Sequence, residues 1–116
     1  LWRSLYSYVA QNVAKKWDEY GNCGLVVGAT YPDELAEVRE LAPDLPILIP
    51  GIGAQGGDVE KTVIAGKDKR GYGMIINSSR GIIFASSGDD FAEAAREETK
   101  RLHDLINQYR QKKGGE

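Results

Sequence analysis

The residues best suited to chemistry in this sequence begin with a glycine cluster, PGIGAQGGD at 50–58. Glycines let backbone N–H groups come close to a bound anion, and a row of such N–H groups can cradle a phosphate. Gly53 and Gln55 are the candidate ligands, because a glutamine amide can hydrogen-bond a phosphate or the edge of a heterocycle. The string GIGAQG also fits the dinucleotide pattern G-x-G-x-x-G. No acidic residue ends the next strand, so we disfavour that interpretation.

A second polar segment, NSSRG at 77–81, follows the next apolar run. The guanidinium of Arg80 can donate two parallel hydrogen bonds to a phosphate, and Gly81 follows it directly. A solvated surface charge is the plain alternative for Arg80. Its place at a strand end, one strand after the glycine cluster, favours phosphate binding.

Helical patterns and short apolar runs alternate along the chain, which indicates an α/β fold with a parallel sheet and helical crossovers. We expect strands at 25–28, 47–49 and 74–76. Their continuous apolar character predicts burial on both faces of the sheet. We expect helices at 1–17, 32–42, 58–65 and 90–111, and a loop with a short helical turn near 80–90. The first helix has an apolar stripe at every fourth position: Leu1, Leu5, Val9, Val13 and Trp17.

This arrangement of strands and helices fits two architectures. One is a small doubly wound sheet, and the other is about three of the eight βα units of a (β/α)8 TIM barrel. In either fold ligands meet the carboxyl ends of the strands, where both polar segments lie. In a barrel the loops after the seventh and eighth strands usually bind phosphate. A glycine loop followed one strand later by Arg80 and Gly81 matches that arrangement.

The overall composition is that of an ordinary globular domain. The chain has 116 residues, and its 15 basic and 17 acidic residues give a net charge of −2. That balance provides no broad basic surface for nucleic acid, and no apolar run approaches the length of a membrane span. The single cysteine, Cys23, excludes an internal disulfide, fits a reducing compartment and is expected to pack beside a strand. We therefore expect a cytoplasmic protein that contacts neither nucleic acid nor membrane.

The remaining polar residues predict structure more than chemistry. His103 falls inside the last helix and is expected to have a surface or packing role. Ser87, Asp89 or Asp90 is expected to cap the start of that helix, and GKDKRG at 66–71 to form a solvated loop. The sequence has neither the spacing of metal ligands nor a Ser/His/Asp set. We therefore expect no metal site.

Three strings in this sequence, GLVVGATYPDEL, PGIGAQGGD and NSSRGIIFAS, resemble the C-terminal portion of orotidine 5′-phosphate decarboxylase. The resemblance runs from about Leu1 to Tyr109. It implies that residues 1–116 are a C-terminal segment of one TIM-barrel domain, carrying strands 6 to 8. It also implies a homodimer that converts orotidine 5′-monophosphate to uridine 5′-monophosphate and carbon dioxide without a cofactor.

The same resemblance assigns roles to four residues. Gln55 would touch the phosphate and the pyrimidine edge, the N–H of Gly53 would face the phosphate, and Arg80 with Gly81 would grip it. The family's D-x-K-x-x-D motif, whose lysine protonates the reacting carbon, does not occur in this sequence. We therefore expect no catalytic residue in this chain and activity only together with the N-terminal part of the barrel.

Two other functions stay open at this point. Another phosphate-gripping barrel enzyme, such as a sugar-phosphate isomerase or epimerase, would share the two loops but use different acids and bases. A half-barrel without catalytic activity could bind phosphate or a partner. A D-x-K-x-x-D motif upstream of Leu1 would favour the decarboxylase over both.

Overall fold

The computed structural model describes residues 2–53 and 58–112 of the chain. At its centre lies a three-stranded parallel sheet in the order β1-β2-β3. The strands are β1 (Leu25–Val26), β2 (Ile47–Ile49) and β3 (Met74–Ile76). The register joins Leu25 to Ile47 and Ile47 to Met74, so strands consecutive in sequence are neighbours in the sheet. The predicted parallel α/β arrangement is confirmed.

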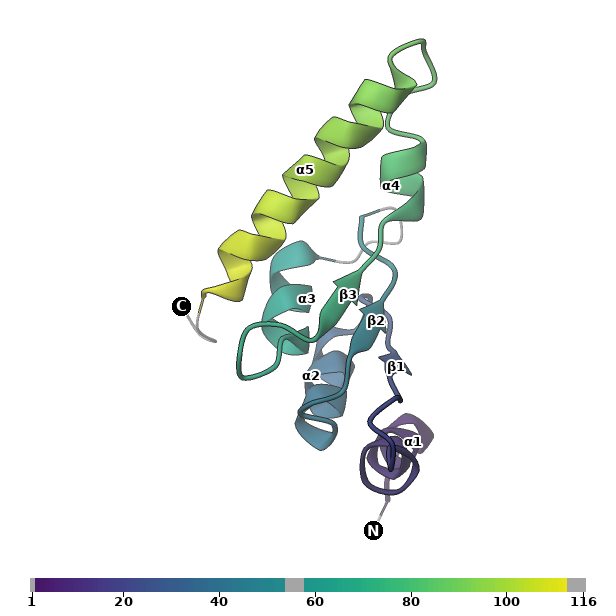
Figure 1. Cartoon of the computed structure of the whole chain (residues 1–116), viewed down its shortest axis with the longest axis vertical. Coiled ribbons are helices and arrows are strands. Elements are labelled where there is room, and N and C mark those ends of the chain that lie inside the picture. The colour runs from purple at the N-terminus through teal and green to yellow at the C-terminus, as the bar shows by residue number, and fades with distance from the viewer. Residues whose placement is uncertain (1, 54–57, 113–116) are drawn as a thin grey trace.

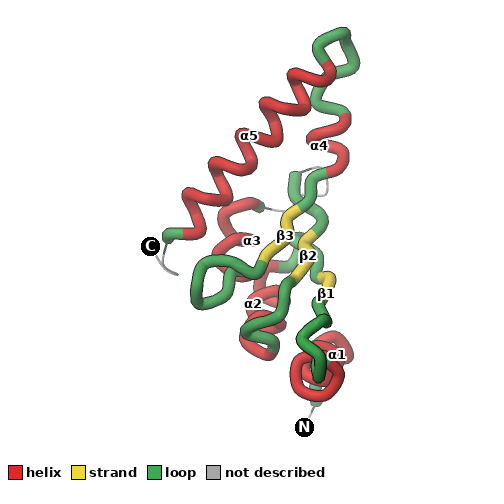
Figure 2. The backbone as a smooth tube through the Cα atoms, viewed as in Figure 1, coloured by secondary structure: helices red, strands yellow, loops and turns green. Residues whose placement is uncertain are grey.

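Helices connect the strands and continue beyond the last one (Figures 1 and 2). They are α1 (Leu5–Asn12) with a π-helical turn η1 (Val13–Trp17), α2 (Pro32–Leu41), α3 (Val59–Gly66), α4 (Ser79–Ile83) and α5 (Phe91–Arg110). Asp58 caps α3, because its carboxylate accepts a 2.9 Å hydrogen bond from the N–H of Lys61. α5 packs against α3 and α4, and its first half extends past the sheet together with α4 (Figure 1).

The N-terminal helix buries Val13, one member of its predicted apolar stripe, but otherwise a different face from the predicted one. Ser7 and Ala10 are buried against the rest of the chain, whereas Leu5 is 77% exposed. Val9 and Trp17 are exposed as well, and Leu1 lies outside the described residues. α1 packs on α2, and small side chains let two helices approach closely. A stripe identifies an apolar face of a helix but not the neighbour that covers it.

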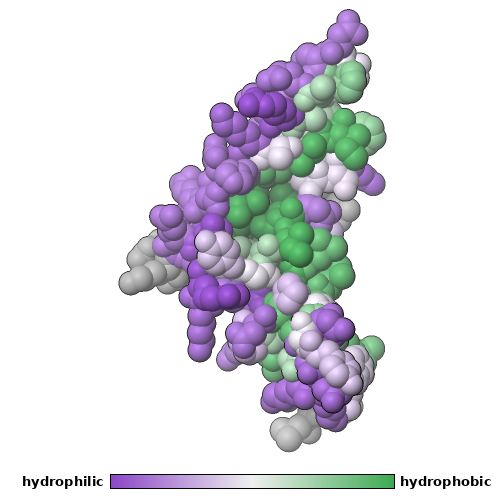
Figure 3. All heavy atoms as spheres, in the orientation of Figure 1, coloured by the Kyte–Doolittle hydropathy of each residue, from purple (hydrophilic) through white to green (hydrophobic). Residues whose placement is uncertain are grey.

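The two faces of the sheet differ in burial. Ile47 and Ile49 are fully buried beneath α2 and α3, but Val26, Leu48 and Ile75 are 70%, 37% and 57% exposed. The register places these three side chains opposite one another, so they form an apolar row across the open face. Figure 3 shows this apolar surface over the strands. The predicted burial on both faces is therefore wrong for this chain, because its helices cover only one face.

A buried arginine ties the amino ends of the strands to the ends of two helices. Arg39 of α2 is only 7% exposed. Its guanidinium donates to the carbonyls of Gly66 (2.7 Å), Ala42 (3.0 Å), Leu45 (2.7 Å) and Gly73 (2.9 Å). Leu45 and Gly73 precede β2 and β3, so this arginine clamp sets where both strands begin.

The predicted solvated loop at 66–71 is instead an ordered turn around a buried carboxylate. Asp68 is 8% exposed and accepts hydrogen bonds from the N–H groups of Arg70 and Tyr72, each at 2.9 Å. Burial disfavours the charged form of this carboxylate and on its own would raise its pKa. The two backbone hydrogen bonds and the Arg70 guanidinium stabilise the charged form more strongly, so the pKa of Asp68 lies below its usual range. A side chain at Gly73 would meet both Arg39 and Asp68 at 2.9 Å.

We expect Asp68→Asn to destabilise the chain at neutral pH by about 1–2 kcal/mol, because the amide loses the charged bond to Arg70. A lowered pKa in the folded state stabilises the fold above about pH 4, the ordinary value, and this contribution disappears as pH falls through the folded-state pKa. Urea unfolding measured between pH 7 and pH 3 should show the two proteins converging in acid. The exposed Asp89→Asn serves as the control, and a difference independent of pH would contradict the assignment.

Candidate functional site

A small polar cavity lies where the carboxyl ends of β2 and β3 meet. Its volume is about 90 Å³, and it is bounded by Pro50, Gly51 and Ile52 on one side. The other side is formed by Asn77, Ser78, Ser79 and Arg80. The structure thus brings Arg80 and the start of the glycine cluster together at one cavity. Carboxyl ends of parallel strands are where ligands bind in α/β folds.

The glycine cluster begins with two residues in left-handed backbone conformation. Gly51 has φ +101° and Gly53 has φ +76°, values that L side chains rarely adopt. Among the described residues other than its chain neighbours, no atom would lie within 4 Å of a Cβ atom at Gly53, so this side of its backbone is open to approach. Gln55, the other candidate in this cluster, belongs to 54–57 and lies outside the described residues.

Arg80 and Gly81 lie in the short helix α4, directly after β3. The predicted short helical turn in this region is therefore confirmed. The side chain of Arg80 is exposed, and no carboxylate of residues 2–53 and 58–112 forms an ion pair with it. A Cβ atom at Gly81 would lie 2.7 Å from Oγ of Ser78, so glycine here makes room for that hydroxyl. Phosphate binding by these residues stays a prediction.

The other polar candidates lie away from this cavity. His103 is exposed on α5, where its ring nitrogens lie 3.3 Å from Asp104 and 3.2 Å from Asn107. Cys23 is a free thiol that packs against the small cluster at the amino end of the sheet. Both fit the predicted surface and packing roles.

The expected cap of the last helix is wrong. Asp90 occupies the N-cap position of α5, but its side chain caps no helix N–H. Its Oδ1 accepts a 2.5 Å hydrogen bond from the hydroxyl of Ser86 instead. Ser87 and Asp89 precede this position in an exposed loop. The hydrogen bond between Ser86 and Asp90 therefore stabilises this loop, and neither residue lines the polar cavity.

The described residues, 2–53 and 58–112, contain no group of three or more histidines, cysteines or carboxylates arranged to hold a metal ion. Within those same ranges, no helix combines the length and the apolar character needed to cross a bilayer. Within these described ranges, the predicted ligand residues Arg80 and the start of the glycine cluster come together at the polar cavity.

Sequence reasoning missed one residue of the cavity, Asn77. Its Oδ1 is buried and has no hydrogen-bond partner in the described part of the chain. A polar residue directly after an apolar strand was the available signal. Asparagine also ends strands without any other role, so the signal was easily passed over.

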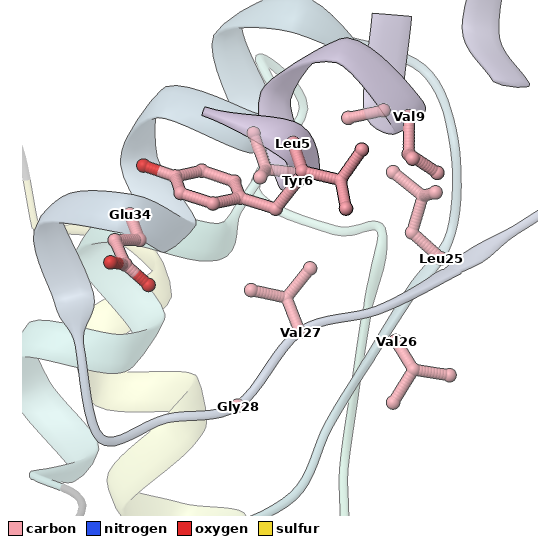
Figure 4. A pocket seen from close by; sticks show the side chains of 10 residues that line it. Leu5, Tyr6, Val9, Leu25, Val26, Val27, Gly28 and Glu34 are labelled. Atoms are coloured by element: carbon pink, nitrogen blue, oxygen red, sulfur yellow. The ribbon is translucent and has the colours of Figure 1, made fainter. Parts of the chain in front are cut away.

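A larger groove lies along the open edge of β1 (Figure 4). Its volume is about 580 Å³, and Leu5, Tyr6 and Val9 of α1 lie on one side of it. Val26 and Val27 lie on the other. The groove is almost entirely apolar, so it suits protein packing better than phosphate chemistry.

Comparison with known protein families shows which family contains this chain. The family model for the orotidine 5′-phosphate decarboxylase / HUMPS family matches residues 3–97. The chain belongs to this family. A relative named orotidine 5′-phosphate decarboxylase from Janthinobacterium sp. is 56% identical over 107 residues. One of the same name from Bordetella avium is 59% identical over 107 residues.

The decarboxylase family members are much longer than this chain. The match covers 92% of the chain but 40% of the Janthinobacterium relative. Among solved structures, Leishmania donovani OMP decarboxylase matches with a TM-score of 0.73 and 41% identity, over 90% of this chain and 40% of that one. Leishmania donovani UMP synthase matches with a TM-score of 0.75 and 44% identity, and the match covers 90% of this chain and 23% of that chain. The fold is therefore part of a (β/α)8 barrel, as predicted.

Proposed function

We propose that this chain supplies the phosphate-binding part of an orotidine 5′-phosphate decarboxylase. That enzyme converts orotidine 5′-monophosphate to uridine 5′-monophosphate and carbon dioxide in de novo pyrimidine synthesis. The observation that carries the proposal is the polar cavity shared by Gly51 and Arg80, in a chain of the decarboxylase family. The names of the relatives favour this function over a sugar-phosphate isomerase or epimerase.

In this proposal four residues bind the nucleotide. The Arg80 guanidinium donates two charge-assisted hydrogen bonds to phosphate oxygens, and the N–H of Gly81 donates a third. The N–H of Gly53 faces the phosphate from the other loop, supported by the open space around its backbone. Gln55 contacts the phosphate and the pyrimidine edge. No metal or cofactor has a part in this binding.

The phosphate lies far from the carbon that loses carboxylate, so these residues contribute remote binding energy that stabilises the transition state. The chain has no D-x-K-x-x-D motif, and the proton and the charged constellation must come from other βα units. We assign residues 1–116 to strands 6 to 8 of the barrel, in a cytoplasmic homodimer. Catalysis then requires the N-terminal part of the same barrel.

The open surfaces of the sheet support this requirement. The N–H groups of Leu25, Val27 and Ala29 donate to carbonyls at β2. In a parallel ladder the alternate residues, Val26 and Gly28, then present their N–H groups to the open edge. An unpaired edge beside an apolar groove is a place where another strand can add. The preceding βα units of the barrel would cover the groove and the apolar row of the open face.

We expect the chain alone to show no decarboxylation, and the chain co-expressed with the N-terminal βα units of the Azoarcus relative to turn over orotidine 5′-monophosphate. That relative is 57% identical over 106 residues, so its units should fit the edge of β1. Turnover is followed by the loss of substrate absorbance, with the N-terminal units alone as the control. Turnover by this chain alone would contradict the proposed division. An assembled barrel that binds the nucleotide without converting it would contradict the proposed function.

A further inference from the structure

Asn77 carries a polar atom for which the described part of the chain offers no partner. Its Oδ1 is buried and accepts no hydrogen bond from residues 2–53 or 58–112. Buried acceptors are normally paired, because leaving them unpaired destabilises the fold. An asparagine that remains at such a position is expected to meet its donor in another state of the protein, such as a complex with a ligand.

The position of Asn77 identifies where that donor would lie. Side chains alternate along a strand, so Asn77 continues the side of the sheet that Ile75 occupies, the open face. Asn77 also lines the cavity between Gly51 and Arg80. Its carboxamide therefore stands at the seam between the two loops that form the proposed phosphate site.

We infer that Asn77 is a further ligand-positioning residue, whose Oδ1 accepts a hydrogen bond from a water that also donates to the bound phosphate. The inference rests on the proposed function. Amide and phosphate oxygens are both acceptors, so a donor with two hydrogens must lie between them. The cavity of about 90 Å³ is larger than one water needs. Water-mediated bonds of this kind hold ligands nearly as well as direct ones.

This role separates ligand affinity from stability. Asn77→Leu keeps a similar volume and removes the unpaired acceptor, so the variant should melt at the same temperature as the unchanged chain or higher. It also removes the acceptor that holds the water, so nucleotide affinity should fall. An asparagine with a purely structural role would show the opposite pattern, with lower stability and unchanged affinity.

The test is a titration of the co-expressed barrel with uridine 5′-monophosphate and with uridine, together with thermal melting. We expect Asn77→Leu to raise the Kd for the monophosphate about tenfold, the effect of one hydrogen bond, and to leave uridine binding unchanged. Asn77→Asp keeps an acceptor but adds negative charge that repels the phosphate, so its loss of affinity relative to the unchanged protein should become smaller as salt is raised. The exposed Asn22→Leu is the matched control and should change neither quantity.

The outcomes distinguish this inference from the proposed function. If Arg80→Ala weakens monophosphate binding and Asn77→Leu does not, the role of Asn77 is overturned and the phosphate site stands. If neither variant changes the affinity, or if the unchanged barrel shows no saturable binding, both are overturned. A lower melting temperature of Asn77→Leu with unaltered affinity would make Asn77 a structural residue.

Discussion

Arg39→Met should lower the free energy of unfolding by about 3–5 kcal/mol and leave much of the chain unfolded at room temperature. Methionine fills a similar volume but donates no hydrogen bond. The carbonyls of Gly66, Ala42, Leu45 and Gly73 would then lose their donor in a buried setting. Each unpaired buried carbonyl destabilises the folded state. The sum of these losses is larger than the stabilisation gained from packing the apolar methionine side chain.

The measurement is urea unfolding followed by circular dichroism. Arg39→Lys should lose less stability than Arg39→Met, because an ammonium keeps the charge and some donors but cannot copy the planar fork. Arg96→Met on the exposed side of α5 is the matched control, with an expected change of about 0.5 kcal/mol or less. If Arg39→Met behaved like that control, the arginine clamp would have no role in stability.

The second large effect concerns Arg80 in the assembled barrel. Arg80→Ala should lower kcat/KM for orotidine 5′-monophosphate about 100-fold, because a bidentate bond to a phosphate contributes roughly 1.5–3 kcal/mol. Arg80 has no competing carboxylate partner among the described residues, so its charge is available to the ligand. The loss should appear in kcat as well as KM, since remote binding energy is used in the transition state.

Steady-state kinetics of the co-expressed barrel test this prediction. Arg80→Lys should recover part of the loss, because it restores the charge without the two-pronged geometry. Arg96→Ala, a change of the same kind on α5, should leave kcat/KM unchanged. A change of less than threefold in kcat/KM for Arg80→Ala would show that the phosphate is held elsewhere.

Local patterns in the sequence were sufficient to predict which segments form strands and helices, although β1 covers only Leu25–Val26 of the expected 25–28 and α1 begins at Leu5. The apolar run at 47–49 predicted β2, and the helix expected at 58–65 forms as α3 (Val59–Gly66). Which surfaces are buried depends on neighbours in space. Leu48 reads as a core residue like Ile47, yet only Ile47 faces the helices. The partner of the open face is not encoded in the run itself.

The sequence likewise predicted some residues of the candidate site and missed others. Arg80 was found because a charged residue at a strand end beside glycines suggests an anion site. Asn77 was missed because its meaning comes from an unpaired atom that only the packed structure reveals. Arg39 was missed for a related reason. On a helix such as α2 an arginine normally faces water, and nothing local marks this one as buried.

The arginine clamp and the polar cavity lie at opposite ends of the same two strands. Arg39 fixes the backbone just before β2 and β3, whereas Gly51 and Arg80 follow them. The loops after the strands can therefore accept new residues while the anchor before them keeps its geometry. Because the two features are separated in space, substitutions in the loops can change what they bind while the contacts of Arg39 are kept. Evolution can therefore alter ligand binding in this segment without loss of stability.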